Sequence, residues 1–303
     1  MTIAIVIVSV LVGSAIWLWL LMRFDKFEPE PLRLVLLIAL GAGLAGFFFA
    51  GLNNSIFHAF LGISFLDDAM PLPEALASAL FVGINEELVK FSATVLMVFK
   101  LREMDEPIDA IIYATAAALG FATFENFAYT LEYGLPSLVI RLITAVPLHL
   151  GTAAIWGLGI AKARFIKGGG YFSASWGYLA VAAVIHAAYD FFIFVIPGRY
   201  MLASLGLSFA IAVALIVFML RRLKHLQRQS PFAPGNVCPR CDGINAPDAR
   251  FCAACGTAIV QEFFIVCETC SVKALKTDRF CAQCGARLPA ERTHGYSSDR
   301  YVR

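Results

Sequence analysis

Seven long apolar runs dominate the first 220 residues of this chain. They lie at about 2–22, 32–52, 73–100, 107–131, 137–161, 174–196 and 200–220. Each is close to the roughly 20 residues that an α-helix needs to cross the hydrocarbon core of a bilayer. The whole chain is 59% hydrophobic and only 15% charged, whereas soluble proteins are roughly 25% charged. The runs predict an all-α polytopic membrane protein with about seven transmembrane helices.

The basic residues between the runs predict which way the chain crosses the membrane. Twelve Lys and Arg residues follow odd-numbered runs, and Arg199 is the one that follows an even-numbered run. Short cytoplasmic loops collect Lys and Arg, so we expect an amino terminus outside the cell and a cytoplasmic carboxyl tail. No basic residue precedes the first run and no small-residue cleavage site follows it, which favours a retained span over a secretory signal.

The rest of the chain is a small cysteine-rich tail. Residues 230–236 combine Pro, Gly and Asn and predict a linker. We therefore expect a membrane domain at 1–229, two tandem modules at 237–289, and a disordered tail at 290–303. All eight cysteines lie in the modules, as two CxxC pairs that recur 29 residues later: Cys238, Cys241, Cys252, Cys255, Cys267, Cys270, Cys281 and Cys284.

Each module resembles a zinc ribbon, because four thiolates in two CxxC pairs suit tetrahedral zinc. A cytoplasmic location keeps thiols reduced, whereas disulfides would require the opposite topology. Such closed sites stabilise a small domain and do not catalyse. We expect two structural zinc ions and a cytoplasmic protein partner, or sensing of zinc or redox state. The near-neutral charge of the tail argues against nucleic acid.

The third apolar run carries three charges near its centre. They are Glu86, Glu87 and Lys90. Inserting one charged side chain at the centre of a bilayer costs roughly 2.5–3.5 kcal/mol, so three such residues indicate a functional site. Glu86 and Lys90 are four residues apart, the favourable order for a helical ion pair. We therefore expect Lys90 to neutralise one glutamate while the other faces a shared cavity.

Other ionisable residues reach a similar depth in neighbouring runs. They are Glu125 in the fourth run, His149 in the fifth, with Arg141 nearer its outer end, and His186 and Asp190 in the sixth. With a rise of about 1.5 Å per helical residue, Glu86, Glu125, His149 and His186 all fall between the bilayer midplane and its outer half. Two imidazoles, carboxylates and a spare glutamate are the groups that a catalytic zinc requires.

At these residues the chain resembles the PrsW family of intramembrane metalloproteases, which are related to the type II CAAX prenyl endopeptidases and bacteriocin-processing membrane proteases. The resemblance covers about 24–197. It rests on these segments: Glu86-Glu-Leu-Val-Lys90, Phe121-Ala-Thr-Phe-Glu125, His149 with Arg141 upstream, His186-Ala-Ala-Tyr-Asp190, and the acidic loop Asp25-Lys-Phe-Glu-Pro-Glu-Pro31.

The resemblance implies a bacterial plasma-membrane zinc endopeptidase that cleaves a membrane protein near the extracytoplasmic side, as with anti-sigma factors. Glu86 or Glu87 would be the catalytic base. His149, His186 and Asp190 occupy the metal-linked positions, with Lys90 and Arg141 in support. Glu125 stands where the CAAX relatives have histidine, which leaves open whether it binds the ion or orients another ligand. The cysteine tail lies outside the family pattern.

Other interpretations stay open from the residues alone. The charges of the third run could form a structural ion network. His149, which follows a proline, could merely bond freed backbone carbonyls, and His186 could be a core histidine oriented by Asp190. A receptor or chaperone on this scaffold would need no catalysis, and a cation carrier would also line its path with such groups. Arg141 could pair with Glu132 or with anionic lipid, and His58 is expected to be solvated in an outer loop.

Overall fold

The structure is a computed structural model of the whole chain. It describes residues 2–63, 70–167, 170–195 and 201–227 of the membrane domain. In the tail it describes residues 230, 232, 236–238, 240, 241, 243–245, 249, 251–259, 264–267, 269, 273–275, 280, 281 and 283–288. Part of the linker and the expected disordered tail at 290–303 lie outside these residues.

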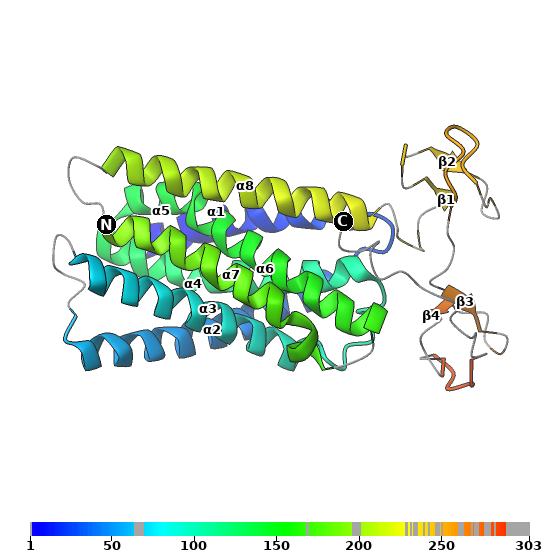
Figure 1. Cartoon of the computed structure of the whole chain (residues 1–303), viewed down its shortest axis with the longest axis horizontal. Coiled ribbons are helices and arrows are strands. Elements are labelled where there is room, and N and C mark those ends of the chain that lie inside the picture. The colour runs from blue at the N-terminus through cyan, green and yellow to red at the C-terminus, as the bar shows by residue number, and fades with distance from the viewer. Residues whose placement is uncertain are drawn as a thin grey trace.

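The described part of the membrane domain is a bundle of eight α-helices and one π-helical turn (Figure 1). The elements, in chain order, are α1 (Ile3–Met22), α2 (Leu32–Leu61), α3 (Leu72–Val98), α4 (Pro107–Tyr133), α5 (Leu135–Ile143), α6 (Ala145–Lys162), η1 (Ala163–Lys167), α7 (Tyr171–Val195) and α8 (Met201–Gln227).

The prediction of an all-α polytopic membrane protein is confirmed. Six segments of the described chain are long and apolar enough to cross a membrane. The helix that completes the predicted seven is α3, which is 27 residues long but carries Glu86, Glu87 and Lys90. Large apolar side chains such as Leu40, Phe48 and Ile56 are exposed on the outside of the bundle, as expected of a surface that faces lipid.

Three predicted spans differ from the observed helices. The seventh was expected to end at 220, but α8 continues to Gln227. The second was expected to end near residue 52, but α2 continues to Leu61 and ends at Gly62, whose φ of 65° suits glycine. The fifth was expected as one helix and is two, because the backbone of Thr144 leaves the helical region (φ −123°, ψ −65°) between α5 and α6. Sequence periodicity detects neither a polar continuation nor a short break inside an apolar run.

Helix α4 is the centre of the bundle, with most of its length buried. Pro107 and a capping box between Glu106 and Asp109 begin the helix. Its approach to α2 is very close, since a Cβ on Gly43 would lie 2.6 Å from the carbonyl carbon of Gly120. Small residues let membrane helices pack backbone to backbone, and here they fix the two helices against each other.

Successive spans alternate in direction, with α5 and α6 together forming one span, so that the connections gather at two ends of the bundle (Figure 1). We call the end at which α1, α3, α6 and α8 finish the tail end, and the opposite end the far end. At the tail end, the side-chain amide of Gln227 donates a hydrogen bond to the carbonyl of Phe24, with an N–O distance of 2.7 Å. The last helix is thereby tied to the loop that follows the first.

The described part of the tail contains two small antiparallel hairpins. Strands β1 (Asn236–Val237) and β2 (Ile244–Asn245) pair in the first module, and β3 (Phe264–Val266) and β4 (Lys273–Leu275) in the second. Each module is built around cysteines, with Cys238 and Cys252 buried in the first and Cys267 and Cys281 in the second. Modules this small have little apolar core, so the cysteine cluster is their main source of stability.

Candidate metal centre

Helices α3 and α7 meet closely enough to bring their polar side chains together. A Cβ on Gly83 would lie 2.7 Å from the backbone nitrogen of Ala187. Gly83 is one turn before Glu86 and Glu87, and Ala187 follows His186. The absence of a side chain at Gly83 therefore lets the glutamate pair and His186 share one site.

Glu87 is completely enclosed and has hydrogen-bond partners on three helices. Its Oε1 lies 2.7 Å from Lys90 Nζ, 3.0 Å from Thr152 Oγ1 and 2.7 Å from His186 Nδ1. Its Oε2 accepts a hydrogen bond from Trp156 Nε1 at 2.9 Å. Both oxygens of Glu87 thus have hydrogen-bond partners. The carboxylate binds Nδ1 of His186, which leaves Nε2 of that ring free to face other groups.

His149 lies between a cation and a carboxylate. Its Nδ1 is 3.0 Å from Lys90 Nζ, which can only donate, so Nδ1 accepts and Nε2 carries the proton. That Nε2 is 2.8 Å from Glu125 Oε2, which also forms a 2.6 Å ion pair with Arg141. Glu125 therefore joins His149 to Arg141 in a chain of charge-assisted contacts.

His186 presents its Nε2 to two carboxylates. Glu86 Oε2 lies 3.6 Å away and Asp190 Oδ2 lies 3.5 Å away. Neither oxygen has a hydrogen-bond partner among the described residues, although both are buried. One ligand atom each from Glu86, His149 and His186 lie within 4.8 Å of one another. Convergent imidazole and unpaired carboxylate groups are a donor set that fits a zinc ion.

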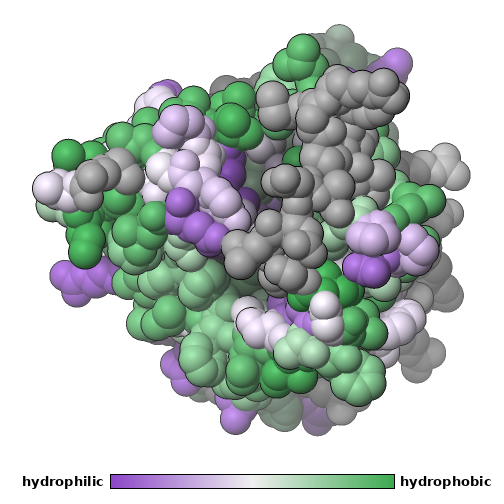
Figure 2. All heavy atoms as spheres, turned by 90° about the vertical axis from the view of Figure 1, so that its left-hand side faces the viewer, coloured by the Kyte–Doolittle hydropathy of each residue, from purple (hydrophilic) through white to green (hydrophobic). Residues whose placement is uncertain are grey.

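One side of this site is more open than the other. The side chains of Glu87 and Lys90 are about 1% exposed, whereas those of Glu125, Arg141 and Asp190 are 14–16% exposed. In the view onto the far end, hydrophobic residues cover much of the surface, and hydrophilic residues lie both near the middle and at places along the edge (Figure 2). The site therefore has a dry interior side and a side on which water can reach the carboxylates.

The structure corrects three expectations, two about ion pairs and one about exposure. Lys90 forms its ion pair with Glu87 and not with Glu86, because the chain turns Glu86 toward α2 and α7. Arg141 pairs with Glu125 and stacks on the Tyr129 ring, with Cζ 3.9 Å from the ring centroid, and not with Glu132. His58 is not a solvated loop residue: it is 2% exposed within α2.

Several polar neighbours of the site were not singled out from the sequence. Asn54 Nδ2 donates to Glu86 Oε1 at 3.3 Å, and Asn85 Nδ2 donates to Asn54 Oδ1 at 2.7 Å. Thr152 and Trp156 follow His149 at helical spacings of three and seven, so they lie on its face of α6 and the spacing is a usable signal. The asparagines of α2 gave no such signal, since they fell beyond the expected end of that helix.

A second group of carboxyls lies at the tail end, where the acidic loop folds against α4. Asp25 Oδ2 accepts from the Glu30 backbone N–H at 2.6 Å, and Glu30 accepts from the Tyr113 hydroxyl. Burial is the main cause that raises the pKa of Asp25 to about 6, and of Glu30 and Glu106 each to about 8. This group positions the loop and lies apart from the candidate metal centre.

The described cysteines of the tail are arranged as thiolates that surround a metal ion are arranged. The Sγ–Sγ distances are 3.4 Å for Cys238–Cys255 and 3.6 Å for Cys241–Cys252 and for Cys267–Cys284. A disulfide requires about 2.05 Å, so these cysteines are not cross-linked. Equivalent glycines turn both modules with positive φ, 70° at Gly256 and 72° at Gly285. Cys270 lies outside the described residues.

Fold and site together define a polytopic membrane protein with a buried, metal-capable carboxylate and imidazole cluster. The chain belongs to the PrsW family of intramembrane metalloproteases, whose model matches residues 30–220, and is therefore a membrane peptidase. A double zinc ribbon model matches residues 238–289. Both predicted resemblances are thereby confirmed, and the family and the ribbon support zinc as the metal.

Curated bacterial relatives agree with this assignment. The chain is 33% identical to Protease PrsW of Geobacillus kaustophilus over 167 residues, which cover 55% of this chain and 69% of that one. It is 32% identical to Protease PrsW of Bacillus subtilis over 38% of this chain and 52% of that one. With Protease PrsW of Clostridioides difficile it shares 28% over 62% and 77%. No solved structure gives a significant match.

Proposed function

We propose that this chain is a zinc endopeptidase that hydrolyses a peptide bond of a membrane protein near the extracytoplasmic side of the plasma membrane. The observation that carries the proposal is the convergence of Glu86, His149 and His186 from three helices to within 4.8 Å. Metal-linked residues at this depth would meet a substrate inside the bilayer or just above it. Two further zinc ions would be structural, one in each ribbon.

His149, His186 and Asp190 are proposed to hold the catalytic ion. His149 would bind through Nδ1, in place of its contact with Lys90 Nζ, because its Nε2 carries the proton toward Glu125. When bound, zinc would polarise the scissile carbonyl and lower the pKa of a bound water. His186 is prepared for this role because Glu87 holds its Nδ1 and leaves Nε2 beside Asp190 Oδ2. Glu125 is proposed to orient His149, since its Oε2 is already paired with Arg141.

Glu86 is proposed as the general base, and Glu87 as a positioning residue. Glu86 Oε2 is buried and has no hydrogen-bond partner among the described residues, whereas both oxygens of Glu87 are occupied. Glu86 Oε2 would take a proton from the attacking water and return it to the leaving amine. Asn54 would steady the other oxygen of Glu86 by the hydrogen bond that it already donates.

The side of cleavage is proposed from the distribution of charge and exposure. Basic residues gather at the tail end, including Arg23, Lys100, Lys162 and Arg222, which favours a cytoplasmic tail. The partly exposed groups of the site belong to the part of the bundle nearer the far end. A substrate of the anti-sigma-factor type, with a single span and an extracytoplasmic segment, fits this arrangement.

The deciding experiment measures metal content and cleavage in a chain that ends at Gln229, so that the ribbons contribute no zinc. This chain should hold about one zinc, and His149→Ala or His186→Ala should remove it. Glu86→Gln should keep the zinc and lose cleavage of a reconstituted membrane substrate. Glu74→Gln, an exposed charge in the first turn of α3, is the matched control.

Each other result would change the proposal. Loss of zinc in Glu86→Gln would make Glu86 a ligand instead of the base. Cleavage that persists in His186→Ala would contradict a metal-dependent peptidase. Movement of zinc across sealed vesicles, lost in His149→Ala, would favour a cation carrier.

We also propose that the ribbons dock a cytoplasmic protein. Phe251 and Phe280 occupy equivalent positions in the two modules and are 66% and 59% exposed. Exposed aromatic side chains are common anchors of protein interfaces. A photo-crosslinking residue at position 251 should give a protein adduct in cells, and the adduct should disappear when Cys252→Ser removes the ribbon metal. No adduct from either phenylalanine position would contradict this proposal.

A further inference from the structure

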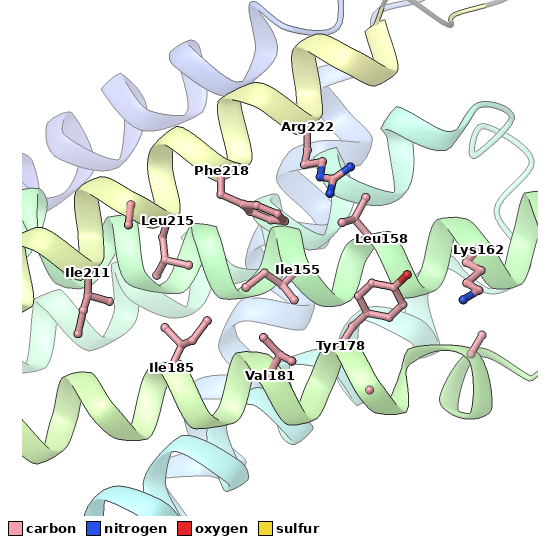
Figure 3. A pocket seen from close by; sticks show the side chains of 13 residues that line it. Ile155, Leu158, Lys162, Tyr178, Val181, Ile185, Ile211, Leu215, Phe218 and Arg222 are labelled. Atoms are coloured by element: carbon pink, nitrogen blue, oxygen red, sulfur yellow. The ribbon is translucent and has the colours of Figure 1, made fainter. Parts of the chain in front are cut away.

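A groove of about 820 Å³ runs along the outer surface of the bundle between α6, α7 and α8. Most of the residues that line it are apolar, and Ile185, Ile211 and Leu215 lie toward one end (Figure 3). Lys162 and Arg222 lie toward the other end with the hydroxyl of Tyr178. No Asp or Glu is among the thirteen lining residues. The groove is thus apolar along its length and cationic at the tail end.

The size and polarity of the groove match one leaflet of a bilayer. Ile211 and Arg222 are eleven residues apart on α8, which corresponds to about 16 Å along a helix. Half of a hydrocarbon core is about 15 Å thick. The cationic end therefore falls at the headgroup level when the apolar part lies among the acyl chains. Exposed lining residues such as Gly177 and Val181 show that the groove opens toward lipid.

We propose that this groove binds one anionic phospholipid of the leaflet at the tail end. An acyl chain lies between α7 and α8, and Lys162 and Arg222 hold the phosphate from two helices. Basic pockets between transmembrane helices recognise anionic headgroups by the same combination of charge and apolar surface. The binding site is independent of the catalytic proposal, because none of its lining residues belongs to the candidate metal centre.

The groove also touches the helices that carry the two histidines. Ile185 precedes His186 on α7, and a Cβ on Gly151, two residues after His149, would collide with the side chain of Leu215. A lipid in the groove therefore packs against the back of both helices.

Native mass spectrometry of the full chain tests the proposal. The protein is released from micelles that contain equal amounts of phosphatidylglycerol and phosphatidylethanolamine with the same acyl chains. The wild type should retain one phosphatidylglycerol. In K162Q/R222Q the preference for the anionic lipid should fall on the order of 30-fold, as two basic contacts are lost. The control R221Q/K224Q removes two exposed charges outside the groove and should keep the preference within about threefold.

A second pair of variants tests the apolar part. Gly177 lines the groove and has no neighbour within 4 Å of an added Cβ, so the Cβ of Gly177→Phe meets no neighbour and its ring is expected to occupy the groove. It should lower retention of both lipids. Gly206→Phe, at an equally open position of α8 that does not line the groove, should not.

Three results would overturn the proposal. They are equal retention of the two lipids by the wild type, equal behaviour of K162Q/R222Q and R221Q/K224Q, or a dimer without lipid that Gly177→Phe dissociates. The last result would assign the groove to a second copy of the chain.

Discussion

The membrane domain and the tail each bring together groups that can hold a metal, but they do so in opposite ways. In the tail, four cysteines within 18 residues converge because two short turns carry them, as Cys238 and Cys255 do. In the bundle, Glu86, His149 and His186 are up to 100 residues apart and converge only because three helices pack closely. A metal centre of the first kind depends on local turns, and one of the second kind depends on the whole fold.

The largest effect on cleavage is expected from removing an imidazole of the bundle. His186→Ala leaves Glu86 and Asp190 facing each other without their shared partner. We expect cleavage by the full chain to fall by about 10³-fold or more, because the contribution of a catalytic metal is several kcal/mol. Zinc content should drop by one per chain while both ribbons keep theirs. An unchanged cleavage rate would show that the bundle does not need this ligand.

A smaller but still large effect is expected from separating α3 and α7 without touching a polar group. Gly83→Val places methyl groups against the backbone of Ala187, and overpacking of this kind costs about 1–3 kcal/mol. Metal affinity and cleavage should fall about 10- to 100-fold as the glutamates move away from His186. Gly177→Val on α7 is the control, since nothing crowds that position. Equal behaviour of the two variants would mean that close packing does not build the site.

A moderate effect on stability is expected from pH at the tail end. Burial raises the pKa of Asp25 to about 6 and of Glu106 to about 8, above unfolded values near 4. The folded state therefore binds protons more tightly, so stability should be greatest at the acid side and fall as pH rises from about 4 to about 8.

Glu106→Gln should weaken this pH dependence, and the melting temperature followed by circular dichroism between pH 5.5 and 8 would measure it. Between the two ends of this pH range, the change in melting temperature should be a few degrees smaller in Glu106→Gln than in the wild type, because 1 kcal/mol corresponds to about 2–4 °C for a chain of this size. Glu103→Gln, a charge change in the same loop, is the control. Stability that rises with pH in the wild type would contradict the assigned burial of these carboxyls.

The smallest effect on cleavage is expected from opening a ribbon. Cys252→Ser should release one zinc and make the first module sensitive to protease, because its fold depends on the metal. Cleavage of a purified substrate should stay within about twofold, since the ribbon supplies no group to the site. A large loss of cleavage would show that the two regions are coupled and that the contrast between them is incomplete.

The sequence was most informative where structure is local. CxxC spacing predicted the ribbons, and apolar runs predicted the number of spans and the helices that carry Glu86, Glu125, His149 and His186. It was least informative about contacts. The choice of Glu87 over Glu86 as the partner of Lys90 depends on Thr152 and Trp156, which α6 brings to Glu87 from 65 and 69 residues away. The break at Thr144 lies inside an apolar run, where periodicity carries no signal.

The hydrogen bond between Gln227 and the carbonyl of Phe24 joins the end of α8, from which the linker and the tail continue, to the loop that follows α1. A protein that binds the ribbons and pulls on the linker would load α8 and this hydrogen bond before the helices that carry His149 and His186. Tension on the linker would therefore reach the loop that contains Asp25 and Glu30 through the end of α8.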